Sequence, residues 1–387
     1  MEVRLDPALL SEVRKYGRFD VEACYNCGSC AAVCSLSTDG AMFPRKSMRY
    51  VQLGLKQPLR GSLDPWLCYY CGDCSKTCPR QTEPGESMMT LRRWLTAQYD
   101  WTGLASRMYR SLWWELGALA AVALLTGWIM TLLMAGTPTE LTAQGGVRIN
   151  EFIPMMRVHI FDWVMAAVLS FFLLPNASRF FWLTMLRDGN PPPLRSYISE
   201  IWALVWNGAT QIRIQECGKN VPRWIKHFLL VTGYGLMFVL VVLFLPWFQT
   251  ENIYPVWHPQ RWLGYYATIV LLIFTVEILW GRIRKAEQIH KFSDFSDWLF
   301  PILLFLTALT GIAIHIFRYS GWAYPTYYAY IIHMMVAVPM LTVEVPLGKW
   351  SHIAYRPLAF YFHAVKLNAA SRAKNASPAP AGLAQGA

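Results

Sequence analysis

Six long apolar runs follow residue 111, and they restrict the fold more than any other feature of the sequence. Each is long enough to cross the hydrocarbon core of a bilayer, which takes about 20 residues of helix. The 387-residue chain is 55% hydrophobic and only 15% charged, whereas globular proteins average about 25% charged residues. We therefore predict an all-α protein with six transmembrane helices, over Leu116–Ala135, Ile160–Leu186, His227–Phe248, Trp262–Trp280, Trp298–Phe317 and Tyr327–Pro346.

The distribution of basic residues predicts the orientation of these helices. The start, Met1–Pro7, contains acidic residues and no apolar core, so we expect no secretory signal peptide and a cytoplasmic N-terminal part. Six spans then return the C-terminus to the same side. The segments assigned to the cytoplasm carry fifteen Lys and Arg against four outside, which satisfies the positive-inside rule. We expect a multi-pass protein of the inner (cytoplasmic) membrane with both termini cytoplasmic, whose net charge of +11 needs no nucleic-acid partner.

The polarity of the chain changes near residue 111. Eight of the nine cysteines and many charges come before it, and the apolar runs come after it. From about Leu367 the chain is rich in Ala, Pro, Ser and Gly, and such a segment cannot bury a core. We predict a cytoplasmic domain at residues 1–110, a membrane domain at residues 111–366 and a disordered tail at residues 367–387.

The cytoplasmic part contains two cysteine runs of identical spacing, C-x2-C-x2-C-x3-C, the second followed by Pro79. Three thiolates spaced three residues apart can bind one face of a [4Fe–4S] cluster. In two-cluster ferredoxins the fourth cysteine of such a run binds the other cluster. We therefore predict two [4Fe–4S] clusters, one on Cys24, Cys27, Cys30 and Cys78 and the other on Cys34, Cys68, Cys71 and Cys74.

Other features of these runs also favour clusters. Gly28 and Gly72 follow the second cysteine of each run and would let the backbone approach a cluster closely. Structural zinc, the alternative, uses two pairs of ligands with a longer gap between the pairs, which fits the runs poorly. Disulfides are not expected in a reducing compartment. The ninth cysteine, Cys217, has no partner at ligand spacing, and we interpret it as an ordinary thiol.

The segment between the two runs indicates a helical form of this domain. It spans 33 residues and includes Pro44–Leu55, whose apolar residues suit a helix. With its two cysteine runs, the region from about residue 15 to 100 resembles the helical two-cluster ferredoxin of heterodisulfide reductase C subunits. This resemblance implies a helical ferredoxin domain rather than a small β-rich one.

Histidines in or beside the apolar spans are candidate haem ligands, because a histidine in the membrane is costly without a partner. Haem b needs two imidazoles at similar depth on facing helices. The last span and its continuation contain His333 and His352. This segment resembles the final helix of nitrate reductase γ-type cytochromes b, where one histidine lies near each membrane face. The resemblance implies that His333 binds an outer haem b and His352 an inner one.

The second ligand of each haem is less defined by the sequence. His227 opens the third span at the inner face, which is the right depth for His352, so we predict it as the inner partner. Two histidines remain candidates for the outer partner, His315 near the outer end of the fifth span and His159 at the outer end of the second. Three further histidines in loops or the tail are not expected to be ligands: His258, His290 and His363.

Four charged residues in or near the spans need a partner of some kind. Arg179, in the polar interruption of the second span, is expected to face protein, a cofactor or water. Arg179 and Arg318 could pair with haem propionates, although snorkelling to the interface explains Arg318 equally well. Glu277 and Glu344 could carry quinone protons, or neighbouring helices could satisfy them.

The order of the two parts is similar to that in the membrane-bound C subunits of quinone-interacting membrane-bound oxidoreductase complexes. This resemblance implies two haems b, a menaquinone site and two partner subunits with flavin and iron–sulfur centres. It also implies delivery of electrons to adenylylsulfate reductase in dissimilatory sulfate reduction. No Walker loop, dinucleotide-binding turn or nucleophile motif is found. We therefore expect an electron-transfer subunit of a quinol-linked oxidoreductase.

Two alternatives remain open. The chain could be the membrane subunit of a heterodisulfide reductase-type or sulfite-reduction complex, which would differ in the electron acceptor. From another functional class, it could be a membrane redox sensor or transporter that contains clusters and no haem.

Overall fold

The computed structural model describes residues 4–37, 42–138, 140–187, 189–216 and 221–376. It is 74% helical, and the described residues contain no strand. The all-α fold predicted from the sequence is confirmed. Cys217 lies outside the described residues.

Short helices form the N-terminal unit. There are eight of them, and they share a core that includes Leu9, Met48, Trp66 and Trp94, each at most 1% exposed. α7 is the longest and runs through the centre of the unit, with thirteen of its sixteen residues buried. The helices are α1 (Leu9–Arg14), α2 (Ser29–Ala32), α3 (Arg45–Gln52), α4 (Lys56–Arg60), α5 (Asp64–Leu67), α6 (Asp73–Lys76), α7 (Pro84–Tyr99) and α8 (Leu104–Arg110), with one 3-10 turn, η1 (Val21–Ala23).

Six long helices follow, and each is long and apolar enough to cross a membrane. All six predicted spans are therefore confirmed as helices, with ends displaced by at most six residues. The second and sixth continue through single π-helical turns, η2 (Trp182–Leu186) and η5 (Met340–Glu344). The helices are α9 (Leu112–Leu133), α11 (Met155–Phe181), α14 (Val221–Val242), α16 (Pro259–Arg284), α17 (Phe295–Tyr319) and α18 (Ala323–Pro339).

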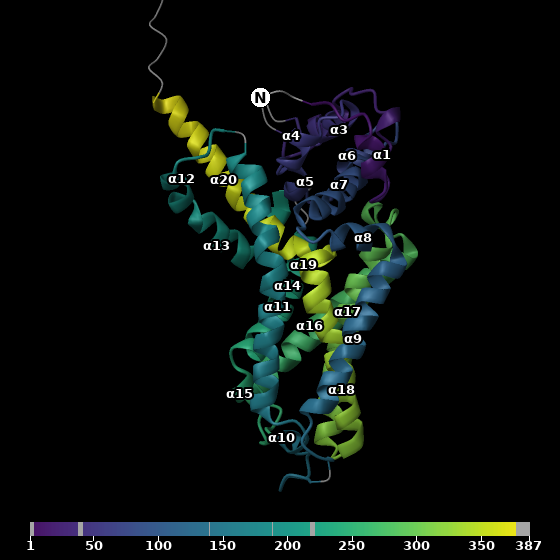
Figure 1. The fold of residues 1–387 in the computed structure, drawn as a ribbon, viewed down its shortest axis with the longest axis vertical. Helices are drawn as coiled ribbons and strands as arrows, with labels where there is room; N and C mark the ends of the chain where they lie inside the picture. Colours follow the sequence, from purple (N-terminus) through teal and green to yellow (C-terminus); the bar gives the residue numbers. More distant parts are fainter. Residues whose placement is uncertain (1–3, 38–41, 139, 188, 217–220, 377–387) are drawn as a thin grey trace, which may run out of the picture.

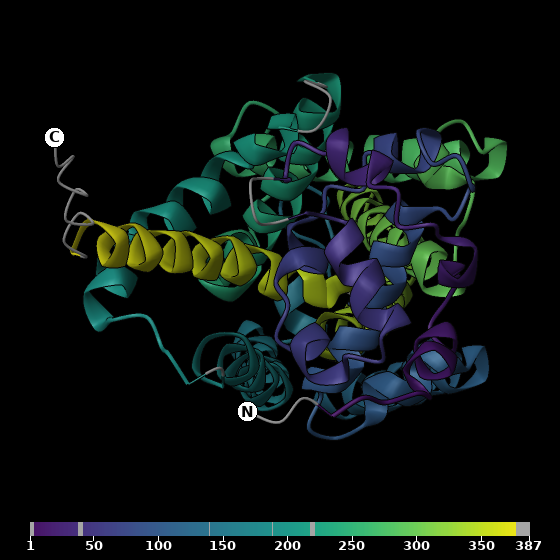
Figure 2. The ribbon, with the colours of Figure 1, turned by 90° about the horizontal axis from the view of Figure 1, so that it is seen from above.

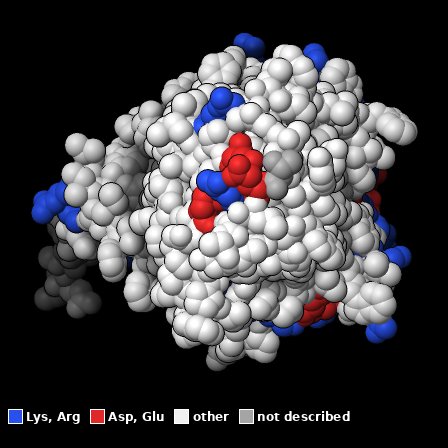
Figure 3. Space-filling view, turned by 90° about the horizontal axis from the view of Figure 1, so that it is seen from below, with Lys and Arg blue, Asp and Glu red and all other residues white. Residues whose placement is uncertain are grey.

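The molecule has two different ends. Figure 1 shows the N-terminal unit stacked on one end of the long helices, with α20 (His352–Ala376) leaving from the same end. Figure 2, seen from that end, shows α20 extending sideways from the bundle. The opposite end carries α10 (Ile149–Phe152) and α15 (Leu245–Phe248). Its surface is mostly uncharged, apart from a small mixed group of charged residues near the centre and scattered charged residues toward the edges (Figure 3).

The shorter elements lie mainly at the end with the N-terminal unit. They are α12 (Leu194–Ser199), α13 (Ile201–Thr210), α19 (Val345–Leu347) and the 3-10 turns η3 (Ile212–Glu216), η4 (Gln288–His290) and η6 (Lys349–Ser351). The predicted disordered tail is wrong for residues 367–376, which continue α20. Alanine and basic residues there favour a helix, and Asn368 binds Ser196 and Glu200. Residues 377–387 lie outside the described part of the chain.

A shared aromatic core fixes the N-terminal unit to the helices below it. Trp66 and Tyr99 pack with Phe180 of α11 and Tyr355 of α20, with ring centroids 5.0–6.4 Å apart. Each such pair adds roughly 0.5–1.5 kcal/mol beyond the apolar area that it buries. The two parts are therefore joined by a buried core rather than by a linker alone.

The irregular stretch of the second span contributes to the same contact. α11 continues through Pro175. Asn176 accepts a hydrogen bond from the backbone N–H of Trp101 at 3.1 Å, and Arg179 donates to the carbonyl of Gln98 at 3.2 Å. Arg179 therefore faces protein, one of the environments expected for it.

Candidate functional site

Three cysteines of the first run line one cavity together with the last cysteine of the second run. The residues are Cys24, Cys27, Cys30 and Cys78. Gly28, with a φ of +88°, turns the chain into α2 between the second and third of these cysteines. We name this space the first cavity.

The second cavity has the reciprocal composition. Cys34, the last cysteine of the first run, lines it together with three cysteines of the second run, Cys68, Cys71 and Cys74. Gly72, with a φ of +85°, occupies the place of Gly28 and leads into α6. A Cβ at Gly72 would lie 3.0 Å from the side chain of Gln288, so a larger residue would be crowded there. Each run contributes its fourth cysteine to the cavity of the other run. Each cavity therefore contains the four cysteines that the sequence predicts as one ligand set.

Corresponding residues have the same backbone conformation in the two cavities. Asn26 and Tyr70 each precede the second cysteine by one residue, with φ of 55° and 53°. Their N–H groups point at the sulfur of the first cysteine, 3.5 Å from Cys24 Sγ and 3.3 Å from Cys68 Sγ. Donors to thiolate sulfur are among the levers that tune iron–sulfur potentials.

The thiols in these cavities would have to ionise before either cavity could hold a cluster. Within the described residues, no three His, Cys, Asp or Glu side chains converge on one ion. Burial raises the pKa of Cys30 and of Cys34 to about 11, and burial also raises the pKa of Cys68 and Cys74. Thiolates are the ligands, so binding of a cluster would displace these protons.

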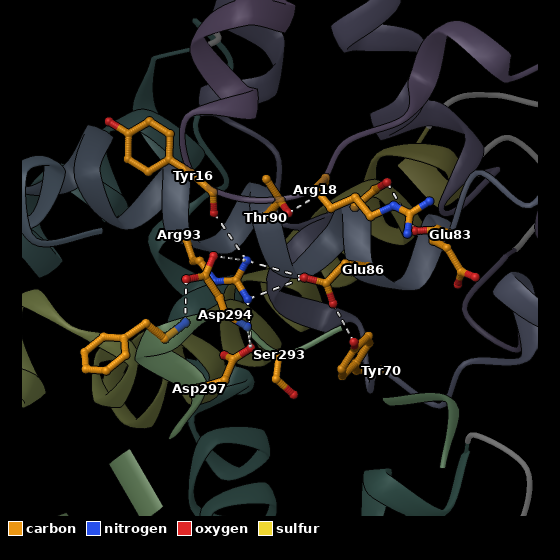
Figure 4. A network of polar contacts seen from close by, with 12 residues as sticks. Tyr16, Arg18, Tyr70, Glu83, Glu86, Thr90, Arg93, Ser293, Asp294 and Asp297 are labelled. Carbon is orange, nitrogen blue, oxygen red and sulfur yellow. Dashed lines mark hydrogen bonds and ion pairs between the residues drawn. The ribbon is translucent and has the colours of Figure 1, made fainter. Parts of the chain in front are cut away.

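A buried ionic network runs from the second cavity toward the long helices (Figure 4). The hydroxyl of Tyr70 donates to Glu86 at 2.5 Å. Arg93 binds Glu86 at 3.4 Å and Asp297 of α17 at 2.9 Å. Asp297 also forms an ion pair with Lys349. Because Arg93, Glu86 and Asp297 are at most 5% exposed, each charge depends on its partners.

Arginines from three helices donate to the backbone beside the second cavity. Arg223 of α14 binds the carbonyl oxygens of Tyr69 and Tyr70 at 2.9 and 3.3 Å. Arg356 of α20 donates to the carbonyl of Trp66 at 3.2 Å. The carbonyl of Cys68 accepts from Arg92 of α7. The positive charge of these side chains favours the added electron of a reduced cluster at this site.

His352 has the arrangement of a positioned ligand. Its Nδ1–H donates to the carbonyl of Lys349 at 2.7 Å, which leaves Nε2 available. Its ring meets that of Phe300 edge to face, with centroids 6.1 Å apart. Burial lowers the pKa of His352 to about 3. The imidazole is therefore neutral at physiological pH, as iron ligation requires.

His227 lies on a helix that packs beside the His352 segment. Its Nδ1 is buried, and no partner is found for it among the described residues. Leu230, one turn further along α14, belongs to the same buried cluster as Trp350. Tyr234 and Trp350 have ring centroids 5.8 Å apart. Nδ1 of His227 and Nε2 of His352 have no hydrogen-bond partner among the described residues. These two imidazoles are the kind of ligand pair that a bis-histidine haem would need.

The three histidines predicted as candidates for the outer haem differ in how their ring nitrogens are engaged. His333 shares a hydrogen bond of 2.9 Å between its Nδ1 and Thr310, which leaves Nε2 to face another group. His315 uses both nitrogens, since Nδ1 accepts from Arg261 at 3.2 Å and Nε2 bonds to the hydroxyl of Tyr265 at 2.8 Å.

His159 accepts from Trp163 at Nε2, and its Nδ1 has no partner among the described residues. Its neighbour Val158 belongs to the same buried cluster as Tyr330 and Met334 of α18. His333 and His159 therefore each keep one ring nitrogen that no described residue engages, whereas both ring nitrogens of His315 are engaged. The sequence leaves both His315 and His159 open as the partner of His333.

The other charged candidates have identifiable surroundings. Glu277 forms an ion pair with Lys226. Arg318 donates to the carbonyls of Val147 and Thr250, and so ties two loops together at the end opposite the N-terminal unit. Glu344 is fully buried. A Cβ at Gly348 would overlap the carboxylate of Glu344, so this glycine leaves room for that side chain.

The sequence did not reveal the network around Arg93. Its charged members are separated by up to 263 positions, from Glu86 to Lys349, and no local pattern relates them. A local signal exists only in the capping box of α17, in which Asp297 accepts from the backbone N–H of Asp294 at 3.0 Å. That signal predicts the start of a helix but not its partner across the interface.

Comparisons with known proteins agree with the cysteine geometry. A family model described as a 4Fe-4S dicluster domain matches residues 23–82, which contain both cysteine runs. The chain is 31% identical over 113 residues to a protein of Archaeoglobus profundus that is named as similar to the C subunit of heterodisulfide reductase. This match covers 29% of the chain and 60% of the relative, so the chain spans about three fifths of that protein's length. No solved structure matches.

Together, the dicluster domain, the relative and the six apolar helices indicate a multi-pass membrane protein with a redox electron-transfer role. The N-terminal domain is a [4Fe–4S] domain.

Proposed function

We propose that this chain passes electrons between menaquinone or menaquinol in the inner membrane and cytoplasmic flavoprotein subunits. In this proposal, two haems b in the membrane part and two [4Fe–4S] clusters in the N-terminal part supply one-electron transfer when bound. The protein contributes the ligands, the buried surroundings and the order in which the sites follow one another.

One observation carries the proposal. On each of two helices, a candidate inner haem ligand is four residues from an arginine that contacts a residue lining the second cavity. Arg223 binds the carbonyls of Tyr69 and Tyr70, and Arg356 lies over the ring of Tyr69 at 5.4 Å. The pairs are Arg223 and His227 on α14, and His352 and Arg356 on α20. Residues four apart lie on one face of a helix with Cβ atoms about 5–6 Å apart. His227 and His352 would therefore hold an inner haem within about one helical turn of the second cavity.

The first cavity would then be the exit to a soluble partner. Cys27 is exposed, and so is Tyr25, whose ring is covered on one side by Arg80 at 4.5 Å. The proposed order is quinol, outer haem, inner haem, second cavity, first cavity and then a flavoprotein subunit. For the outer haem we propose His333 with His159, and His315 is the alternative partner.

We propose Glu344 as a proton acceptor for quinol oxidation. It lies buried beside Glu115, which is 2% exposed. Two buried carboxylates repel each other, so a shared proton stabilises the pair. Glu344→Gln should slow quinol oxidation while leaving both clusters loaded, and Glu277→Gln, which removes a carboxylate already paired with Lys226, should have a smaller effect. Equal rates in the two variants would contradict the role of Glu344.

The partners follow from the resemblance rather than from the contacts. We propose two partner subunits with flavin and iron–sulfur centres, and adenylylsulfate reductase as the final acceptor. The relative's name favours a heterodisulfide reductase-type complex as the second candidate. Purification of the chain from its native membrane, with identification of the subunits that remain bound and of the acceptor that they reduce, separates the two.

The experiment that tests the function is a reduced-minus-oxidised optical spectrum of the purified protein, combined with haem and iron quantification. Two haems b and about eight non-haem irons per chain, reducible by a menaquinol analogue, are expected. Eight irons without haem would contradict the quinone route and favour the redox sensor or transporter.

A further inference from the structure

Helices α12 and α13 have the reverse polarity of helices on a water-exposed surface. Their large apolar side chains point outward, and six of them are 50–74% exposed. A helix on the surface of a soluble protein turns its apolar stripe to the core and its polar face to water. The six residues are Leu194, Ile198, Ile201, Trp202, Val205 and Trp206.

The inner face of the same two helices is polar. Ser196, fully buried, shares a hydrogen bond of 3.0 Å with Asn368 of α20. Asn368 also donates to Glu200 at 2.8 Å. The hydroxyl of Tyr361 donates to the carbonyl of Tyr197 at 2.8 Å. Polar contacts thus attach α12 and Glu200, the residue before α13, to α20, and the exposed apolar face of α12 and α13 is left to meet something else.

The position of the two helices indicates what their outer face meets. They follow the second candidate span, which ends at Leu186, and precede the third, which begins at Val221. Figure 1 shows them beside the upper ends of α11 and α14, below α20. α13 has ten residues, too few to cross a bilayer. Its outer face therefore continues the apolar surface of the spans at the level where they leave the membrane.

Two further features match a lipid interface. Trp202 and Trp206 are stacked one turn apart, with ring centroids separated by 6.3 Å, and tryptophan is enriched where apolar and polar lipid regions meet. Basic side chains border the segment. Arg195 is exposed on α12, and Arg187 lies over the ring of the half-exposed Trp182 at 5.7 Å. Such charges attract anionic headgroups.

We propose that α12 and α13 form an in-plane anchor that lies on the cytoplasmic membrane surface, with Trp202 and Trp206 inserted among anionic lipids. The anchor holds α20 at a fixed height, because Ser196, Glu200 and Tyr197 bind it. This inference does not depend on the identity of the electron donor or acceptor.

Photo-crosslinking of the full chain in lipid nanodiscs that contain phosphatidylglycerol tests the proposal. The photoreactive residue p-benzoylphenylalanine replaces Trp202 in one variant and Ile198 in a second, which repeats the test if the first does not accumulate. Leu124, 67% exposed in the middle of α9, is the lipid-facing control. Leu5, also 67% exposed but in the N-terminal unit, is the water-facing control. Retention of cluster absorbance shows that each variant is folded.

We expect lipid adducts at position 202 or 198 in a yield within about threefold of that at position 124, and no lipid adduct at position 5. Adducts only with protein, whether a second copy of this chain or another protein, would overturn the proposal. A yield at positions 202 and 198 no higher than at position 5 would overturn it as well.

Discussion

The two cavities have nearly the same local geometry and very different surroundings. In both, a glycine in the left-handed region follows the second cysteine and a backbone N–H points at the first sulfur. Cys27 of the first cavity is exposed, whereas Cys68 of the second is only 6% exposed. Arg223 and Arg356, which come from the membrane part, contact Tyr69 in the wall of the second cavity.

This difference separates what the repeated cysteine run determines from what the fold around it determines. The spacing alone sets how a cluster is held, so both cavities look alike. The tertiary contacts set which cluster faces the membrane part and which faces the solvent. Direction in the proposed electron path is therefore a property of the interface and not of the motifs.

The largest expected effect comes from breaking the exchange of cysteines. Cys34→Ala should remove the cluster of the second cavity, and Cys78→Ala that of the first, because each residue lies in the cavity opposite its own run. Iron should fall from about eight to about four per chain in each variant. Electron paramagnetic resonance of the remaining cluster identifies which one is lost. Loss of the cluster of the residue's own run would reverse the assignment.

The second prediction concerns the ionic network on the side of the second cavity. Arg93→Met leaves the buried carboxylates of Glu86 and Asp297 without their shared partner. Removing one member of a buried ion pair costs roughly 3–5 kcal/mol. Arg14→Gln breaks an exposed pair with Glu22, and its cost should be only a small fraction of that of Arg93→Met, because water screens an exposed pair. Thermal unfolding in detergent measures both, and similar shifts would show that the network contributes little.

The glycines should respond unequally despite their common conformation. A side chain at φ near +85° costs about 1–2 kcal/mol at either position. At Gly72 the new Cβ would also lie 3.0 Å from Gln288, whereas at Gly28 the nearest atom is 3.8 Å away, on Arg45. Gly72→Ala should therefore lower the melting temperature more than Gly28→Ala. Equal shifts would mean that Gln288 moves aside.

The smallest effect is on the cluster potentials. Arg223→Gln should lower the midpoint potential of the second cluster by on the order of 50 mV and leave the first unchanged, because a nearby positive charge favours the reduced form. Arg80→Gln should shift only the first cluster, and by less, since Arg80 is exposed and screened by water and salt. A redox titration followed by electron paramagnetic resonance measures both shifts. A common shift of both clusters in either variant would contradict the separation of their environments.

The features that the sequence predicts are those that depend on local spacing. The two ligand groups follow from the C-x2-C-x2-C-x3-C runs, and the six spans follow from apolar length. The in-plane pair α12 and α13 was not predicted, since each is too short for a span and its apolar residues lie among Arg187, Arg195 and Arg213. The contacts of Arg93 and Arg356 depend on how distant helices meet, which spacing does not encode. The prediction for the tail was wrong where α20 gains partners from α12.

The most direct test of the account is rapid mixing of a menaquinol analogue with the wild-type protein and with His352→Ala. We predict that the variant contains about eight non-haem irons per chain but that quinol does not reduce its clusters on the wild-type timescale. His258→Ala is the matched control, because His258 caps the start of α16 at the opposite end, and it should behave as the wild type. Cluster reduction at the wild-type rate in His352→Ala would contradict the proposed route from the membrane to the second cavity.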